Sequence, residues 1–164
     1  MKNYVLMCSH RCSGAVMKSL SYHGIDFYCP MLKQQKRRRD ASGYHRENLT
    51  PLFPGYMFVS MDFTTQHPSC FVAMSNIIGL VNFAGQPAEV SDEVLLAIKA
   101  QENTFAHQMR GIKSINSELA AILAMPNPDY RAKAFIHYIC QQQKSSFIKR
   151  RKNECSKSKY ARQT

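Results

Sequence analysis

The side chains with the clearest capacity for chemistry are the thiols and imidazoles near the N-terminus. Cys8, His10 and Cys12 are spaced two residues apart, and His23 and Cys29 follow soon after. Thiolate and imidazole are ligands that Zn²⁺ prefers in proteins. Structural zinc sites usually pair their ligands in tight knuckles, however, and Cys8 falls at the end of an expected strand with one loosely spaced partner. We therefore expect reduced thiols here and no metal.

The other residue patterns that support catalysis are missing from the sequence. No glycine-rich turn follows an expected strand as a P-loop or a dinucleotide fingerprint requires, and no nucleophile elbow is present. Carboxylates are few and scattered, and His107 and His137 fall on expected helices without an evident partner. We expect neither an enzyme nor a bound cofactor.

The compartment follows from the lack of targeting signals. No apolar run approaches the roughly 18 to 20 residues that span a bilayer, and the N-terminus lacks the order of a signal peptide. We expect a cytoplasmic protein without membrane contact, in which the cellular thiol buffers keep all cysteines reduced. The six cysteines are Cys8, Cys12, Cys29, Cys70, Cys140 and Cys155.

Positive charge is the dominant property of the composition. The chain has 164 residues and a formal net charge of +11. Residues 144–164 hold eight basic residues against one acidic residue, a net charge of +7, and residues 33–46 hold six further basic residues. Charge of this size indicates a polyanionic partner, so Lys36, Arg37, Arg38 and Arg39 are candidate nucleic-acid contacts. The alternative is a solvated surface that serves solubility.

Hydrophobic periodicity predicts an α+β fold, an antiparallel sheet flanked by helices, for the first hundred residues. The expected order is β-α-β-β-α-β-α. Strands are expected at 4–7, 26–32, 54–62 and 77–83, and helices at 15–22, at 67–75 and after 91. Three features refine the helices: Gly24 closes the first in a left-handed cap, Phe71, Val72 and Met74 are buried in the second, and Ser91 caps the third.

The alternation in the strand at 54–62 sets its two faces apart. Tyr56 and Phe58 fall on one side, while Met57, Val59 and Met61 fall on the other, which is the presumed core side. Two aromatic side chains therefore lie on the face away from the presumed core. An exposed apolar patch of this kind is typical of a binding surface.

The chain changes character after residue 102. An apolar stripe at helical spacing runs from Phe105 to Leu123, a break follows at 126–128, and Asp129 can cap a second helix. The apolar face of that second helix comprises Ala132, Phe135, Ile136 and Ile139. A helical hairpin cannot bury its stripe alone, so it must dock on the first domain, on a partner or on a second copy. We expect three parts: a domain at 1–102, the hairpin at 103–143, and a disordered basic tail at 144–164.

Five segments of the first domain, in this order, resemble the N-terminal domain of the NusG transcription factors. They are YVLM at 4–7, FYCPM at 27–31, PLFPGYMFV at 51–59, NIIGLVNF at 76–83 and PAEVSDE at 87–93. The third is the most specific. The leucine and phenylalanine at 52 and 53 and the spacing from Phe58 to Val90 look closer to the specialised paralogue RfaH, and plasmid-borne relatives are a plausible origin.

This resemblance implies a factor that suppresses pausing or termination while bound to RNA polymerase. In the family, an apolar patch of this domain docks on the clamp helices of the largest catalytic subunit. The residues at the matching positions here are Phe53, Pro54, Tyr56 and Phe58. The alternative is that the C-terminal helices cover Tyr56 and Phe58 as ordinary core.

The resemblance also implies polar contacts. RfaH-like proteins carry a His-Thr-Thr-Thr segment that touches the polymerase gate loop, and HPSC at 67–70 falls there, so His67 and Ser69 can keep the contact although Pro68 and Cys70 depart from the pattern. The family further reads non-template DNA from its first turn and first helix, and nascent RNA is a second possible ligand. The candidates for this nucleic-acid contact are His10, Arg11, Lys18, His23 and Asn76.

The C-terminus departs from the family. NusG proteins usually continue into a small β-barrel, the KOW domain, whose glycine-rich signature does not occur after residue 102. RfaH masks its own polymerase-binding patch with a helical C-terminal domain, and docking of residues 105–143 over Tyr56 and Phe58 is the analogous hypothesis. The competing function is a general nucleic-acid-binding module, in which the two basic segments bind and the aromatic strand is core. The sequence leaves the oligomeric state open.

Overall fold

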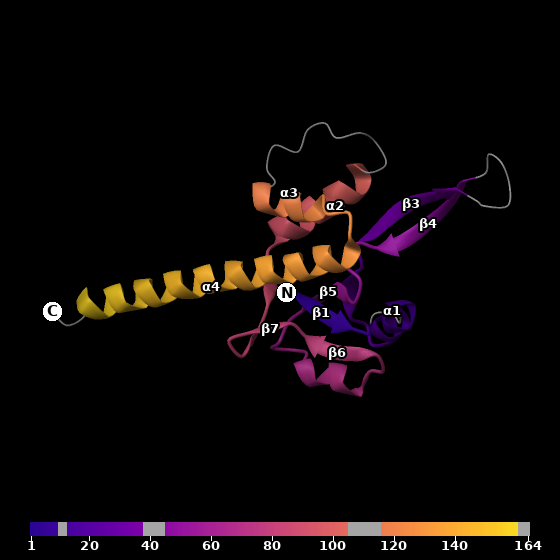
Figure 1. Ribbon diagram of the computed structural model, residues 1–164. Coiled ribbons are helices and arrows are strands. Elements are labelled where there is room, and N and C mark those ends of the chain that lie inside the picture. Colours follow the sequence, from indigo (N-terminus) through magenta and orange to yellow (C-terminus); the bar gives the residue numbers. More distant parts are fainter. Residues whose placement is uncertain (10–12, 38–44, 105–115, 161–164) are drawn as a thin grey trace.

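The computed structural model describes residues 1–9, 13–37, 45–104 and 116–160, and it has the α+β architecture expected from the sequence (Figure 1). The elements in chain order are β1 (Lys2–Cys8), α1 (Ser13–Tyr22), β2 (Asp26–Tyr28), β3 (Met31–Arg37), β4 (His45–Pro51), β5 (Tyr56–Met61), the 3₁₀ helix η1 (Pro68–Ala73), β6 (Ile77–Leu80), β7 (Asn82–Phe83), β8 (Gln86–Pro87), β9 (Glu89–Val90), α2 (Asp92–Thr104), α3 (Ser117–Leu123) and α4 (Pro128–Tyr160).

An antiparallel sheet forms the centre of the molecule. Its strand order is β2-β5-β1-β6, and β9 also pairs with β1. The register places Val5 of β1 opposite Phe58 of β5, so both side chains point to the same face. Two further ribbons, β3-β4 and β7-β8, lie outside this sheet. The β3-β4 hairpin projects from one side of the body (Figure 1).

Each face of the sheet has its own hydrophobic core, because alternate residues of the central strands point in opposite directions. On one face, α1 and η1 cover Tyr4 and Leu6 of β1 and the methionines and valine of β5. On the other face, α2, α3 and α4 pack over Val5 and Phe58. Figure 1 shows α4 crossing the molecule between the sheet and the α2-α3 pair. The C-terminal helices thus cover the face of the sheet opposite α1 and η1.

Most of the expected elements form, and the differences have local causes. The strand expected at 26–32 is divided into β2 and β3 at Cys29 and Pro30, because proline has no amide hydrogen for a strand ladder. The helix expected at 67–75 is a 3₁₀ helix, whose three-residue period places Phe71 and Met74 in the core. The expected burial of Val72 is therefore wrong: its side chain is 87% exposed.

The helix termini follow from short polar side chains. Gly24 has φ +64° and ends α1 as expected. The amide of Val94 donates to Ser91 Oγ at 3.5 Å at the start of α2. Asn127 caps α4, since its Oδ1 accepts from the amides of Asp129 (2.9 Å) and Tyr130 (3.2 Å), so the expectation that Asp129 is the cap is wrong.

The C-terminal segment differs most from its expectation. Residues 144–160, expected as a disordered tail, continue α4 as helix to Tyr160. The stripe expected from Phe105 lies partly outside the described residues, and its described part is α3, where Leu119, Ile122 and Leu123 are buried. No described helix has the length and apolar character needed to cross a membrane.

Candidate functional site

A tight turn before β5 sets the geometry of the candidate site. The amide of Tyr56 donates to the carbonyl oxygen of Phe53 at 3.0 Å, and Gly55 has φ +80°. Proline at the second position and a residue with positive φ at the third define a type II turn, which explains why Pro54 and Gly55 stand together. The carbonyl oxygen of Gly55 accepts from the amide of Cys8 at 2.9 Å, which ties the turn to β1.

Four aromatic rings, which we call the aromatic cluster, meet where this turn faces α4. Phe135 of α4 stacks on Phe53 with ring centroids 4.4 Å apart and meets Phe58 edge to face at 5.7 Å. Tyr28 of β2 stacks on Phe58 at 6.0 Å. Phe53, Phe58 and Phe135 are 1%, 3% and 0% exposed. Offset stacked and edge-to-face pairs stabilise such a cluster beyond the burial of apolar area.

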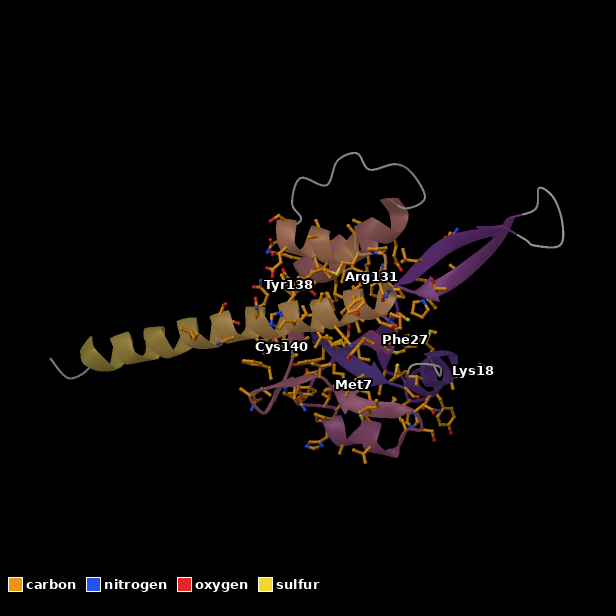
Figure 2. All side chains as sticks on the ribbon, in the orientation of Figure 1. Met7, Lys18, Phe27, Arg131, Tyr138 and Cys140 are labelled. Atoms are coloured by element: carbon orange, nitrogen blue, oxygen red, sulfur yellow. The ribbon has the colours of Figure 1, made fainter. Side chains whose placement is uncertain are left out.

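A buried arginine connects α4 to the same turn. Arg131 is 5% exposed, and its Nε donates to the carbonyl oxygen of Leu52 at 2.9 Å. Its Nη1 donates to the carbonyl oxygen of Met125 at 2.6 Å. Burial lowers the pKa of this guanidinium, although arginine stays charged in proteins. Figure 2 shows Arg131 at the end of α4 that lies beside the base of the β3-β4 hairpin.

A polar contact borders the aromatic cluster on the side of α2. The hydroxyl of Tyr28 donates to Glu102 at 2.5 Å, and the amide of Met31 donates to the other oxygen of that carboxylate. Burial, followed by the hydrogen bond to Glu102, raises the pKa of Tyr28. The ammonium of Lys99 lies 5.0 Å from the centroid of the Tyr28 ring, within the range of a cation-π interaction.

The aromatic residues predicted to form an exposed patch are therefore covered. Phe53 and Phe58 are buried under α4, while Pro54 and Tyr56 are partly buried. The prediction that the aromatic face of β5 is open to solvent is wrong in this conformation, because the C-terminal helices contribute a second core on that face. Of the three docking options for the hairpin, the structure has it docked on the first domain.

The two residues predicted for the gate-loop contact lie together at the start of η1. His67 is the N-cap, with Nδ1 2.8 Å from Ser69 Oγ and 3.2 Å from the Ser69 amide. Both side chains are exposed. The described surface thus presents an imidazole and a hydroxyl at one point.

The residues predicted to contact nucleic acid are spread over the sheet face opposite α4 and over the hairpin. Lys18 and His23 are exposed on and just after α1, and Figure 2 shows Lys18 on the side of the sheet away from α4. Asn76 is exposed, has φ +67°, and its carbonyl oxygen accepts from the Ser9 amide at 2.9 Å. His10 and Arg11 lie outside the described residues.

The first basic segment lies on the β3-β4 hairpin. Its register places Lys36 opposite Arg46 and Arg37 opposite His45. Arg38 and Arg39 lie outside the described residues. The basic segment, which follows the strand expected at 26–32, is therefore itself strand from residue 33 to Arg37.

The cysteines whose side chains the structure describes form no disulfide bond. They are Cys8, Cys29, Cys70 and Cys140. Burial, followed by the charge of Cys8, raises the pKa of Cys29 to about 11. Within the described ranges, no three His, Cys, Asp or Glu side chains are grouped to hold a metal ion. His10 and Cys12, two of the conceivable zinc ligands, lie outside those ranges.

Sequence reasoning missed Arg131 and Glu102 as parts of this site. Arg131 precedes Ala132 and stands four residues before Phe135, so helical periodicity places it on the apolar stripe, and that position was the available signal. For Glu102 the sequence gives no signal, because its partners Tyr28 and Met31 are more than 70 residues away.

Comparison with known proteins identifies the first domain. The profile of the NusG family, described as transcription termination factor nusG, matches residues 1–99. Among solved structures, the chain is similar to the one described as domain interaction in Thermotoga maritima NusG, with 19% identity and a TM-score of 0.41, over 68% of this chain and 62% of that one. This chain thus spans about three fifths of that structure's length, 62%. No curated protein sequence matches it. Because the family profile covers more than half of the chain, the protein belongs to the NusG family, whose members are transcription factors rather than enzymes.

Proposed function

We propose that this protein is a transcription elongation and antitermination factor that docks on RNA polymerase. The proposed surface consists of Phe53, Pro54, Tyr56 and Phe58, and the proposed partner is the clamp-helix pair of the largest catalytic subunit. The observation that carries the proposal is the type II turn at the start of β5, which holds two phenylalanines and a tyrosine on one face of a domain of the NusG family. Aromatic anchors of this kind dominate protein-protein binding energies.

Because these rings are buried under α4, the proposed docking on polymerase requires that α4 first move away from them. Phe135 and Arg131 hold α4 on the surface that polymerase would need. We infer that α3 and α4 mask the site in the free protein and move away on binding, as in the RfaH-like specialisation. Such a transition requires that the partner bind the open form better than the closed form. In this proposal the free protein rests in the closed form, in which α4 covers the aromatic cluster.

The polar candidates add secondary contacts. His67 and Ser69 would meet the gate loop, and Lys18, His23 and Asn76 would meet exposed non-template DNA or nascent RNA. Their exposure supports this assignment, and Lys18 lies on the side of the sheet away from α4 (Figure 2). Lysine neutralises phosphate, and histidine stacks on unpaired bases.

The test measures polymerase binding and terminator read-through with the full chain. Phe135→Ala should loosen α4 and strengthen polymerase binding, whereas Tyr130→Ala, an aromatic truncation at an exposed position of the same helix, should not. Adding Tyr56→Ala to Phe135→Ala should then weaken binding, because it removes a ring of the proposed surface. Circular dichroism checks that each variant keeps its fold.

The outcomes separate docking from masking. Polymerase binding that Phe135→Ala leaves unchanged would disprove masking while leaving docking in place. If neither the wild-type chain nor Phe135→Ala binds polymerase or alters read-through, the proposed function is wrong. The competing function, a general nucleic-acid-binding module, is favoured by the burial of Phe53 and Phe58 at 1% and 3% exposure, and it predicts that last result.

A further inference from the structure

The C-terminal half of α4 differs from the half that packs on the body. Buried side chains of α4 end at Ile139, and Gln143 donates to the carbonyl oxygen of Glu89 at 3.2 Å. Beyond it, the described side chains of Lys144, Ser145, Ser146 and Ile148 are all exposed. Figure 1 shows the helix continuing past the body on the side opposite the β3-β4 hairpin. Residues 144–160, which we call the arm, extend over about 25 Å as helix.

The arm concentrates positive charge, as residues 33–46 also do. Seven basic residues against a single acid, Glu154, give it a net charge of +6. The basic residues are Lys144, Lys149, Arg150, Arg151, Lys152, Lys157 and Lys159. Four of them are consecutive in the sequence, so their positions in the helix do not share one face. Like charges this close repel each other, and a polyanion removes that repulsion.

We propose that the arm is a separate nucleic-acid-binding element that contacts the phosphodiester backbone. A helical segment with seven basic residues in 17 suits a ligand that is itself a dense row of negative charges, because each phosphate contact releases a counterion. A membrane surface would require a continuous apolar face, and the arm offers only scattered apolar residues, Phe147, Ile148, Cys155 and Tyr160. The arm does not depend on polymerase docking, since it lies beyond the part of α4 that covers the aromatic cluster.

The test measures affinity of the full chain for three labelled ligands: a 20-base-pair DNA duplex and 20-nucleotide single strands of DNA and RNA. The arm variant carries Lys149→Gln, Arg150→Gln, Arg151→Gln and Lys152→Gln, because glutamine keeps helix propensity. We expect at least a tenfold loss of affinity near 50 mM salt, and a salt slope reduced by about 3 for single strands. The ligand with the largest loss identifies the nucleic acid that the arm prefers.

A matched pair of variants separates the arm from the general charge of the protein. The arm pair is the double variant Arg150→Gln and Arg151→Gln. The body pair is the double variant Lys99→Gln and Lys133→Gln, which removes the same charge from two exposed lysines of the body. The arm pair should lose more affinity than the body pair. Equal losses, an unchanged salt slope for all three ligands, or binding of poly-glutamate as tight as that of nucleic acid would overturn the proposal. Circular dichroism confirms that helix content is retained.

Discussion

Arg131 of α4 donates from Nε to the carbonyl oxygen of Leu52 at 2.9 Å, next to the turn that carries Phe53. This contact joins residues 79 positions apart and places a charged group at 5% exposure between the C-terminal helices and the NusG-family domain. A buried charge raises the cost of closing an interface relative to an apolar residue, but it fixes the alignment of the parts. The contact therefore favours one docked position of the C-terminal helices.

Replacing Arg131 should loosen α4 selectively. Arg131→Ala leaves the carbonyl oxygens of Leu52 and Met125 without this donor. Hydrogen bonds of a charged donor contribute about 1.5–3 kcal/mol, so we expect a decrease of about 2 kcal/mol in the free energy of unfolding and faster amide exchange in α3 and α4. Lys133→Ala, at an exposed position of the same helix, is the control and should change little. Equal effects of the two would argue against the buried contact.

Tyr28 should make stability sensitive to alkaline pH. Burial, followed by the hydrogen bond to Glu102, raises its pKa in the fold above the ordinary tyrosine value of 10.0. A raised pKa contributes stability that is present below about pH 10, the unfolded value, and is lost as the pH rises above it. Tyr28→Phe should lower stability at pH 8 by about 1.5 kcal/mol because it removes the bond to Glu102. Urea unfolding should show that the difference in the free energy of unfolding between the wild-type protein and Tyr28→Phe is smaller at pH 10.5 than at pH 8. An equal difference at both pH values would contradict this role of Tyr28.

Cys29 should be slow to react with thiol reagents. Its pKa of about 11, against the usual 9.0, leaves roughly a hundredfold less thiolate at pH 8 than an unperturbed cysteine has. Alkylation by iodoacetamide, followed residue by residue with mass spectrometry, should be slower by about that factor than alkylation of a cysteine in a short peptide. Reaction at the rate of the reference peptide would show that Cys29 is less buried than described.

The cap of α4 gives a paired test of helix initiation. Asn127→Ala removes an acceptor of two amide hydrogens and should reduce stability by about 1 kcal/mol. Asp129→Ala should reduce it by less, about 0.5 kcal/mol, because Asn127 still accepts from both amides. Thermal unfolding of both variants under the same conditions decides between the two residues. A larger loss from Asp129→Ala would restore the assignment made from the sequence.

The sequence predicted the elements well where a periodic pattern and a local stop signal coincide. Gly24 ends α1 and Ser91 begins α2 because each acts through its immediate neighbours. Prediction from the sequence was less successful where tertiary contacts decide which side chains are buried. Alternation separated the two faces of β5 correctly, but it could not reveal that α4 would supply Phe135 to the aromatic face, since that contact crosses 77 or more residues of chain.

The candidate site also divides into features that local sequence predicts and features that tertiary contacts decide. The motif at 51–59 identified Phe53 and Phe58 by type, while their exposure depended on the docking of α4. Charge counting located the basic segments but not their backbone conformation: like charges favour disorder, and yet α4 extends to Tyr160 as helix. Continuation from a well-packed helix avoids the cost of nucleating a new one, which is a tertiary effect that local composition cannot express.

The continuity of α4 has a mechanical consequence. The helix contains 33 residues, and the contacts of Arg131 and Phe135 lie near its first end. A rotation of about 20° at that end would carry Tyr160, some 43 Å along the axis, through roughly 15 Å. Because α4 is one continuous helix, a small shift of the Phe135 ring from its stack on Phe53 produces a large displacement of the positively charged C-terminal end of the helix. A pair of fluorophores, one on the sheet and one near Tyr160, would register that swing.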